Sequence, residues 1–304
     1  MRIRQPGRVS DGLWCLGREE SNVYLLQGTE GTMLISGGMS GIVPDVLQQL
    51  REFGLDEGRI TSCLILHAHF DHVGIIPFFK RRIPGMEVYA SERAWQLLGK
   101  DKVIETINAF SQVTDEQLGM SRHNHNLDVD WRDDVSGTVV REGDVLSLGN
   151  REVRILETPG HSSCSISAYV PELKVLFPSD GGGIPYKDEI IPSGNSNFTK
   201  FQQSLEKLAP LDVDFVCADH CGFVTGDEAG HFIRNAQVAA AEFRKLMERA
   251  YTRIGDVDQT VQHLVQKTFE QRPDYFLPRD ILTGVYKQMV RHIAEQIEPA
   301  QDGS

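Results

Sequence analysis

Four side chains of the kinds that bind metal ions lie within the six residues HAHFDH. They are His67, His69, Asp71 and His72, and the apolar run CLIL comes directly before them. A short apolar run bounded by polar residues is typical of a buried strand, and ligands in α/β sheets gather at the carboxyl ends of strands. The segment therefore predicts metal-binding residues at the end of a buried strand.

The same arrangement, an apolar run followed by a possible ligand, occurs three more times. The pairs are Val153 to Leu156 with His161, Lys174 to Phe177 with Asp180, and Val213 to Cys217 with His220. Parallel strands of one layered domain can bring their carboxyl ends to one edge although they lie far apart in sequence. We therefore expect the side chains at all four strand ends to converge.

The seven residues divide into two sets of ligands around a shared carboxylate. The first set is His67, His69 and His161, and the second is Asp71, His72 and His220. Asp180 can bridge both sets, with one oxygen directed to each ion. Nitrogen and oxygen ligands without thiolate suit zinc, iron or manganese alike. The predicted cofactors are therefore two divalent transition metal ions.

A centre of this kind is suited to hydrolysis. Water bound to a divalent ion has its pKa lowered to about 7, and two ions can hold both the nucleophile and the developing oxyanion. We therefore expect a metal-bridging hydroxide to attack an ester carbonyl, with Asp71 and Asp180 as the catalytic carboxylates. A protein nucleophile is unnecessary, and the sequence contains no G-x-S-x-G elbow.

Other histidines and cysteines are predicted to have no role at the centre. His123 and His125 lie in the polar stretch RHNHN, which no strand presents, so we expect a solvated loop. Cys221 is next to His220 but is expected to pack rather than react, since nothing nearby marks a base for it. The five cysteines are scattered and lack a CxxC pair, which is typical of reduced intracellular thiols.

Composition excludes several kinds of partner. The formal charge of the 304 residues is -12, with 31 Lys and Arg against 43 Asp and Glu, and it disfavours nucleic acid. The sequence has no apolar run of the roughly 20 residues that a membrane span needs, and no signal-peptide pattern. We expect a cytoplasmic protein whose substrate is a small-molecule ester or thioester such as an acyl-coenzyme A. A homodimer is compatible with the sequence.

The elements that must position these residues alternate early and become helical late. Short strands are expected near residues 13–16, 22–26 and 32–35, a helix at 44–54, a helical insertion at 91–135, renewed strands at 151–225, and helices at 228–255, 258–268 and 279–297. This pattern predicts an α/β domain over residues 1–228 and a C-terminal helical extension over 229–304 that covers the active site.

The loop QRPDYFLP within this extension is unusually apolar. Tyr275, Phe276 and Leu277 lie between two prolines and could roof the site as a substrate pocket. They could equally anchor the extension to the rest of the protein. The sequence favours neither alternative.

HAHFDH, followed by His161 in TPGH, Asp180 and His220, resembles the motif set of the metallo-β-lactamase superfamily. The resemblance implies an αββα sandwich with a binuclear metal site at the sheet edge. Because the superfamily includes lactamases, lactonases, nucleases and oxygen reductases, the fold does not settle the reaction. Flavodiiron oxygen reductases carry a glutamate at the position of His69, and true β-lactamases generally lack the bridging aspartate, so ester-type hydrolysis remains.

Within that superfamily the chain is similar to the thioesterases of quinolone-signal biosynthesis. The similar stretches are SGGMS at residues 36–40, FDHVGIIPFFKRRIPGMEVYASER and YFLP. The chain departs from them in GGGIP, the residues that follow Asp180, which have no acidic residue where those thioesterases have a glutamate. The resemblance implies a thioesterase, and the alternatives are a phosphodiesterase-type hydrolase or a regulatory protein that binds a ligand or partner through its helices.

Overall fold

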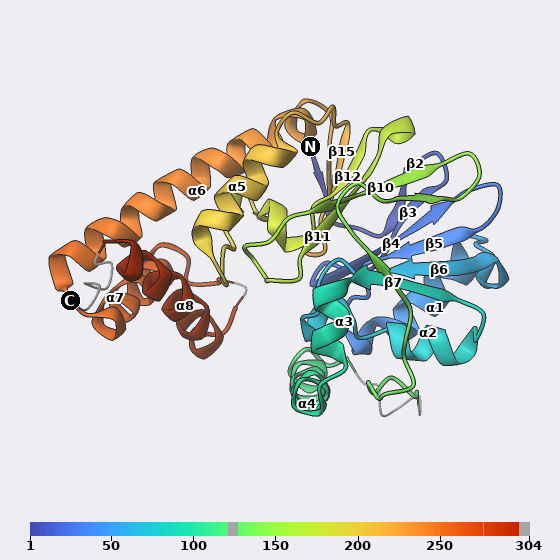
Figure 1. Cartoon of the computed structure of the whole chain (residues 1–304), viewed down its shortest axis with the longest axis horizontal. Coiled ribbons are helices and arrows are strands. Elements are labelled where there is room, and N and C mark those ends of the chain that lie inside the picture. The colour runs from blue at the N-terminus through green and yellow to red at the C-terminus, as the bar shows by residue number, and fades with distance from the viewer. Residues whose placement is uncertain (121–126, 276, 298–304) are drawn as a thin grey trace, which may run out of the picture.

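The protein is a four-layered αββα sandwich, in which two mixed sheets pack face to face and helices cover both outer faces (Figure 1). The computed structural model describes residues 1–120, 127–275 and 277–297. Over these residues the first sheet has the strand order β2-β3-β4-β5-β6-β7-β8 and the second has β1-β16-β15-β12-β11-β10-β9. The fold class predicted from the sequence is confirmed.

The first sheet and its helices come from the first half of the chain. Its strands are β2 (Gly7–Ser10), β3 (Leu13–Arg18), β4 (Ser21–Gln27), β5 (Thr32–Ile35), β6 (Ile60–Leu64), β7 (Glu87–Ser91) and β8 (Thr138–Val140). The helices on its outer face are α1 (Val43–Glu52), α2 (Ile76–Arg82), α3 (Glu92–Leu98) and α4 (Asp101–Gln117).

The second sheet takes its long strands from the second half. Its strands are β1 (Arg2–Ile3), β9 (Val145–Ser147), β10 (Glu152–Glu157), β11 (Ile166–Val170), β12 (Val175–Phe177), β15 (Phe215–Cys217) and β16 (Phe223–Thr225). A separate hairpin consists of β13 (Ile184–Tyr186) and β14 (Glu189–Ile191). The helices are α5 (Phe198–Leu208), α6 (Asp227–Ile254), α7 (Val257–Gln271) and α8 (Arg279–Ile297).

Three hydrophobic clusters fill the three interfaces between the layers. The alternation along β4 illustrates how one strand serves two of them. Val23 and Leu25 face the helices of the first sheet, whereas Tyr24 and Leu26 face the second sheet. Successive side chains of a strand point to opposite faces, so a strand buried on both sides is apolar throughout.

Several predicted elements agree closely with the structure. The helix expected at 228–255 is α6, which ends before Gly255, a residue in the left-handed conformation with φ 73°. The helical insertion expected at 91–135 is helical only as far as Gln117, in the two helices α3 and α4, and the described residues 127–135 are not helical. The expectation that strands resume only at residue 151 is wrong, because β8 and β9 come earlier. These strands are short and partly exposed, with Val145 49% exposed, so they lack a buried strand's apolar run.

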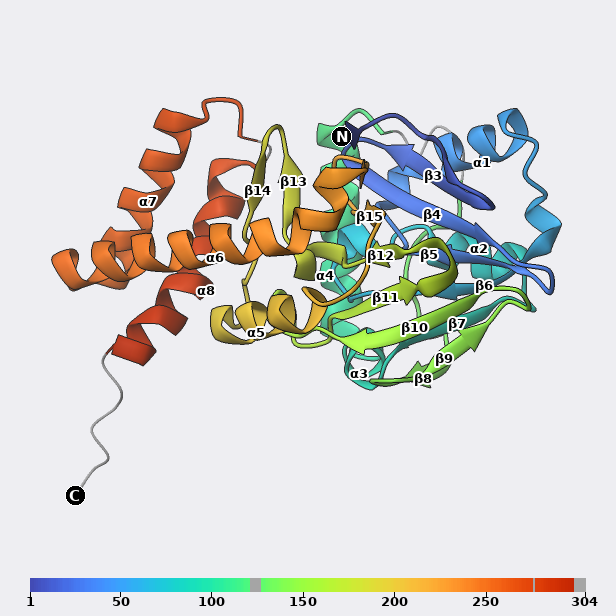
Figure 2. The same cartoon turned by 90° about the horizontal axis from the view of Figure 1, so that it is seen from above.

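The C-terminal helices pack on α5, on one another and against the β13–β14 hairpin (Figures 1 and 2). Polar contacts fix the hairpin to the loop between α7 and α8. The hydroxyl of Tyr186 donates to the carbonyl of Asp274 at 2.8 Å, and Lys187 pairs with the Asp274 carboxylate at 2.6 Å. Arg272 forms a further ion pair with Glu189. The extension and the hairpin therefore form one packed unit.

Tyr275 lies inside this unit. Its side chain is 8% exposed, and its ring packs against Tyr186 at 5.8 Å and Phe269 at 6.2 Å between ring centroids. Leu277 is partly buried on the same cluster, and Phe276 lies outside the described residues. These contacts favour the anchor alternative, while the substrate-pocket role and the domain boundary at residue 228 stay predictions.

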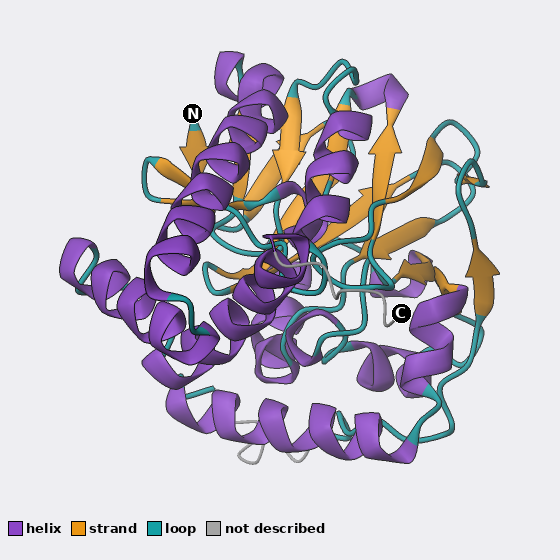
Figure 3. Cartoon of the chain, turned by 60° about the vertical axis from the view of Figure 1, so that its left-hand side comes forward, coloured by secondary structure: helices purple, strands orange, loops and turns teal. Residues whose placement is uncertain are grey.

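Figure 3 shows helices on both sides of the strands. Across the described residues, no helix combines the length and apolar character needed to cross a membrane.

Candidate metal centre

The two sheets bring the predicted residues together at one edge of the sandwich. In the second sheet β12 is parallel to β15, and β10 and β12 are each antiparallel to β11, so these three strands run in the same direction. β6 belongs to the first sheet. His161 follows β10, Asp180 follows β12 and His220 follows β15, while the segment 67–72 follows β6.

The glycines that precede and follow the HAHFDH segment allow two loops to pack closely. The N–H of Gly37 donates to the carbonyl of His72 at 2.8 Å, and that of Gly74 donates to Gly38 at 2.7 Å. A Cβ at Gly74 would lie 2.2 Å from the backbone nitrogen of Ser40. The SGGMS motif therefore supports the ligand segment through its backbone.

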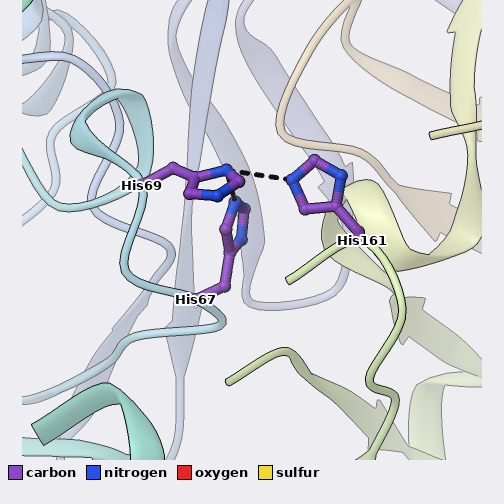
Figure 4. A group of neighbouring side chains, drawn as sticks. All are labelled: His67, His69 and His161. Atoms are coloured by element: carbon purple, nitrogen blue, oxygen red, sulfur yellow. Dashed lines mark hydrogen bonds between the residues drawn. The ribbon is translucent and has the colours of Figure 1, made fainter. Parts of the chain in front are cut away.

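Three imidazoles form the first cluster, which Figure 4 shows with their ring nitrogens directed toward one another. Nδ1 of His69 lies 3.2 Å from Nε2 of His67 and 3.0 Å from Nε2 of His161. His67 and His161 are 0% and 3% exposed. Three nitrogens that converge at such distances can share one ion.

Asp71, His72 and His220 form the second cluster, and Asp180 lies between the two. Asp71 Oδ2 is 3.4 Å from His72 Nε2 and 3.6 Å from His220 Nε2. Asp180 Oδ2 is 3.5 Å from His72 Nε2 and 3.4 Å from His161 Nε2 of the first cluster. Its other oxygen is 3.6 Å from His220 Nε2. Asp180 therefore contacts both clusters, as the bridging assignment requires.

Outer partners fix which ring nitrogen faces the centre. The Nδ1 atoms of four imidazoles pair with oxygens: His67 with Ser179 Oγ at 3.0 Å, His72 with Asp219 Oδ2 at 2.9 Å, His161 with the Ser193 carbonyl at 2.8 Å, and His220 with the Glu20 carbonyl at 2.6 Å. A histidine that donates through one ring nitrogen offers the lone pair of the other to a metal. All four Nε2 atoms are thereby directed inward.

The sequence analysis missed Ser179 and Asp219. The Ser179 hydroxyl donates to Asp219 Oδ2 at 2.5 Å, which joins the partners of His67 and His72 into one network. Both residues directly precede a predicted ligand, in PSD and ADH. That adjacency is the one local signal that could have identified them.

The first cluster consists of neutral imidazoles. Burial and the neighbouring His161 lower the pKa of His69 to about 4. Burial is also the main cause that lowers the pKa values of His67 and His161. Neutral imidazole is the form that binds metals, so these side chains are in the required state at pH 7.

The second cluster carries a concentration of negative charge. Burial would raise the pKa of Asp180, but His72, His220 and His161 hold it well below its usual range. The pKa of Asp71 is likewise lowered, against its burial, by His72 and His220. Burial would lower the pKa of His72, but Asp71 and Asp180 hold it well above its usual range. Two ionised carboxylates, Asp180 buried and Asp71 partly buried, favour the presence of a cation.

These observations fit two divalent ions. Nε2 of His72 is buried without a hydrogen-bond partner, although carboxylate oxygens lie 3.4 and 3.5 Å away. A buried polar atom without a partner is unfavourable, and an ion between these groups would satisfy it. The donors of the two clusters would hold the ions, and Asp180, which contacts both clusters, would contribute to each. Asp219 also lies near His67 and His72, but it contacts the outward Nδ1 of His72.

Of the remaining predicted residues, Cys221 is partly buried in the hydrophobic cluster of the C-terminal helices. Burial raises the pKa of its thiol to about 11, which disfavours the reactive thiolate. His123 and His125 lie outside the described residues.

The fold and the site define an αββα protein with clustered histidine and aspartate side chains at the edge between its sheets. The family model for the metallo-beta-lactamase superfamily matches residues 16–220. The chain therefore belongs to the metallo-beta-lactamase superfamily.

Curated relatives in this superfamily have different activities. The acyl-coenzyme A thioesterase MBLAC2 of Gallus gallus is 29% identical over 196 residues, which cover 63% of this chain and 67% of that protein. The human MBLAC2 is 28% identical over 53% of this chain and 57% of its own length. A nitric oxide reductase of Moorella thermoacetica is 23% identical over 60% of this chain but only 43% of that protein.

Solved structures share the fold over nearly the whole chain. A metallo-beta-lactamase family protein from Thermus thermophilus has a TM-score of 0.69 at 19% identity and covers 96% of both chains. A beta-lactamase domain protein from Burkholderia ambifaria has a TM-score of 0.68 at 17% identity and covers 98% of this chain and 89% of its own. The shared fold therefore includes the C-terminal helices.

The number of metal ions bound per chain tests the division of the donors into two clusters. Protein purified anaerobically, or stripped with a chelator and reloaded, is expected to hold close to two equivalents of transition metal per chain, because the donors form two clusters. Elemental analysis provides the measurement. A single equivalent, with Asp71, His72 and His220 uncoordinated in a crystal structure, would contradict the expectation.

Proposed function

We propose that the protein is a metal-dependent hydrolase of acyl thioesters, with acyl-coenzyme A as the substrate class. The observation that carries the proposal is the position of Asp180, whose two oxygens contact both clusters of donors. The similarity to acyl-coenzyme A thioesterases supports the thioester as substrate. The more specific likeness to quinolone-signal thioesterases stays a prediction that rests on sequence motifs.

When bound, a pair of divalent ions supplies a water molecule of lowered pKa and polarises a carbonyl oxygen. The chain's own residues hold the donors in place and leave one side open. Asp71 is the more exposed of the two carboxylates, with its side chain 19% exposed against 8% for Asp180. Hydrolysis adds the oxygen of water to the acyl carbon and breaks the C–S bond. The products are a carboxylate and a thiol: one proton of the water goes to the leaving thiolate sulfur, and the other is released to solvent.

Turnover of a substrate panel tests the proposal. Protein loaded separately with zinc, iron(II) or manganese(II) is assayed with acyl-coenzyme A thioesters of different chain lengths by release of the free thiol. Bis(4-nitrophenyl) phosphate is the control substrate, because the same centre could hydrolyse a phosphodiester. We expect a kcat/KM of about 10⁴ M⁻¹s⁻¹ or more for the preferred thioester.

Two results would contradict the proposal. One is faster turnover of the phosphodiester than of every thioester. The other is no thioester hydrolysis with any of the three metals, which would favour a regulatory protein that binds a ligand or partner.

A further inference from the structure

The candidate centre opens to solvent on one side. His67 and His72 are 0% exposed and His161 is 3% exposed, so the centre is closed where these residues lie. The Asp71 side chain is 19% exposed, and His69 is more exposed than the other imidazoles of its cluster. A substrate therefore approaches past His69 and Asp71.

Phe70 lies between these two residues and connects the open side to α4. It begins the short 3₁₀ helix Phe70–His72, which packs against α4. Its ring stacks on Phe110 of α4, with 5.6 Å between ring centroids and 26° between ring planes. The aromatic surface of α4 is thus continuous with the segment that carries the proposed ligands.

The exposed side of α4 is apolar near this contact. Phe110 is 44% exposed and Val113 is 50% exposed, and residues three apart on a helix are neighbours on its surface. Leu118, just beyond the helix, is 40% exposed. The other large exposed apolar side chains of the described chain, such as Val238, lie far from one another in sequence. A group of this kind beside a polar site is typical of a binding surface.

The exposure of Phe110 does not arise from a loosely held helix. On the opposite side of α4, Asp115 is 1% exposed and accepts hydrogen bonds from Ser40 Oγ at 2.6 Å and from the N–H of Gly41 at 3.1 Å. Ile107 is buried in the core beneath the first sheet. The helix is therefore fixed, and it presents Phe110 and Val113 to solvent in a defined position.

We propose that Phe110 and Val113, continuous with Phe70, bind the apolar acyl group of the substrate. This inference rests on the proposed function and adds to it the class of acyl group, an extended apolar one. The acyl carbonyl would lie at the open side of the centre and the chain along α4. Tyr275, the described aromatic residue of the C-terminal loop, is buried against Tyr186 and Phe269 and is not available for this role.

Alkyl hydroxamates test the subsite independently of the reaction. Their headgroup binds divalent metals whatever substrate the centre hydrolyses, and only the tail differs between acetohydroxamate and octanohydroxamate. Affinities are measured by titration calorimetry on metal-loaded protein. In the wild type we expect octanohydroxamate to bind about tenfold tighter than acetohydroxamate, because its tail leaves water for the apolar surface.

Three variants distinguish the subsite from other effects. Phe110→Ser is expected to abolish most of the preference for the longer tail and to leave acetohydroxamate binding unchanged. Phe110→Leu, which keeps an apolar side chain, is expected to retain most of it. Val238→Ser removes an apolar side chain of α6 that is 58% exposed and should have no effect. Thermal melts check that each variant is folded.

The outcomes separate this inference from the proposed function. An unchanged preference in folded Phe110→Ser, an equal loss for both hydroxamates, or no binding of octanohydroxamate to the wild type would overturn the subsite. A preference that depends on Phe110 in a protein without thioesterase activity would support the subsite and reject the proposed function.

Discussion

Asp180→Ala is expected to lower thioester hydrolysis by about three orders of magnitude and to reduce the metal content below two equivalents per chain. The reason is geometric. Asp180 is placed with one oxygen 3.4–3.5 Å from nitrogens of His161 and His72 and the other 3.6 Å from His220. Its removal takes a donor from both clusters at once, and the distance between the two bound ions is then no longer fixed by a shared carboxylate. Activity and elemental analysis of the same preparation provide the measurement.

The fold should survive this substitution. The packing of β12 rests on Val175, Leu176 and Phe177, which are all 0% exposed. The Asp180 carbonyl, which accepts a hydrogen bond from Ser193, is retained in the variant. Asp188→Ala removes an exposed carboxylate at the hairpin tip and serves as the matched control. Full activity in a well-metallated Asp180→Ala protein would overturn the bridging assignment.

The residues of the candidate centre could be predicted because each follows a strand with a local pattern. An apolar run and the ligand after it lie within a few residues of each other, as Val175 to Phe177 and Asp180 illustrate. The direction of the strands then brings the ends together. The outer partners have no comparable signal. His161 and His220 bind the backbone carbonyls of Ser193 and Glu20, which any residue type could supply.

Exposed and buried apolar residues were harder to distinguish. Phe110 and Val113 continue the helical spacing of Ile107, yet only Ile107 is buried. Periodicity identifies a helix, but how far the apolar side extends beyond the core depends on what packs against it. Tyr275 posed the opposite problem, since its apolar loop predicted either a roof or an anchor. Its ring contacts Phe269 of the preceding helix, but also Tyr186 of the β13–β14 hairpin, a contact between segments far apart in sequence.

The network behind the histidines leads to the second large effect. Asp219 is 3% exposed and its Oδ2 contacts both His72 Nδ1 and the hydroxyl of Ser179. It therefore fixes the orientation of His72 and keeps Nε2 of that residue directed inward. Partners of this kind typically change metal affinity by about 10–100-fold when they are removed.

We expect Asp219→Ala to weaken the ion held by Asp71, His72 and His220 by about 10–100-fold, with a smaller effect on the other ion. The second effect is smaller because Asp219 reaches His67 only through Ser179. Stepwise removal of metal by a competing chelator measures both affinities. Asp219→Asn keeps an oxygen acceptor for His72 and should recover part of the loss.

Asp214→Ala, which removes an exposed carboxylate at the opposite end of β15, is the matched control for charge. A purely structural role for Asp219 predicts a lower melting temperature and an equal change in both affinities. A role in positioning predicts that the two affinities diverge and that Asp219→Asn restores the weaker one. If each ion binds to Asp219→Ala as tightly as it binds to the wild type, the positioning role is rejected. That result would mean that the bound ion itself orients His72.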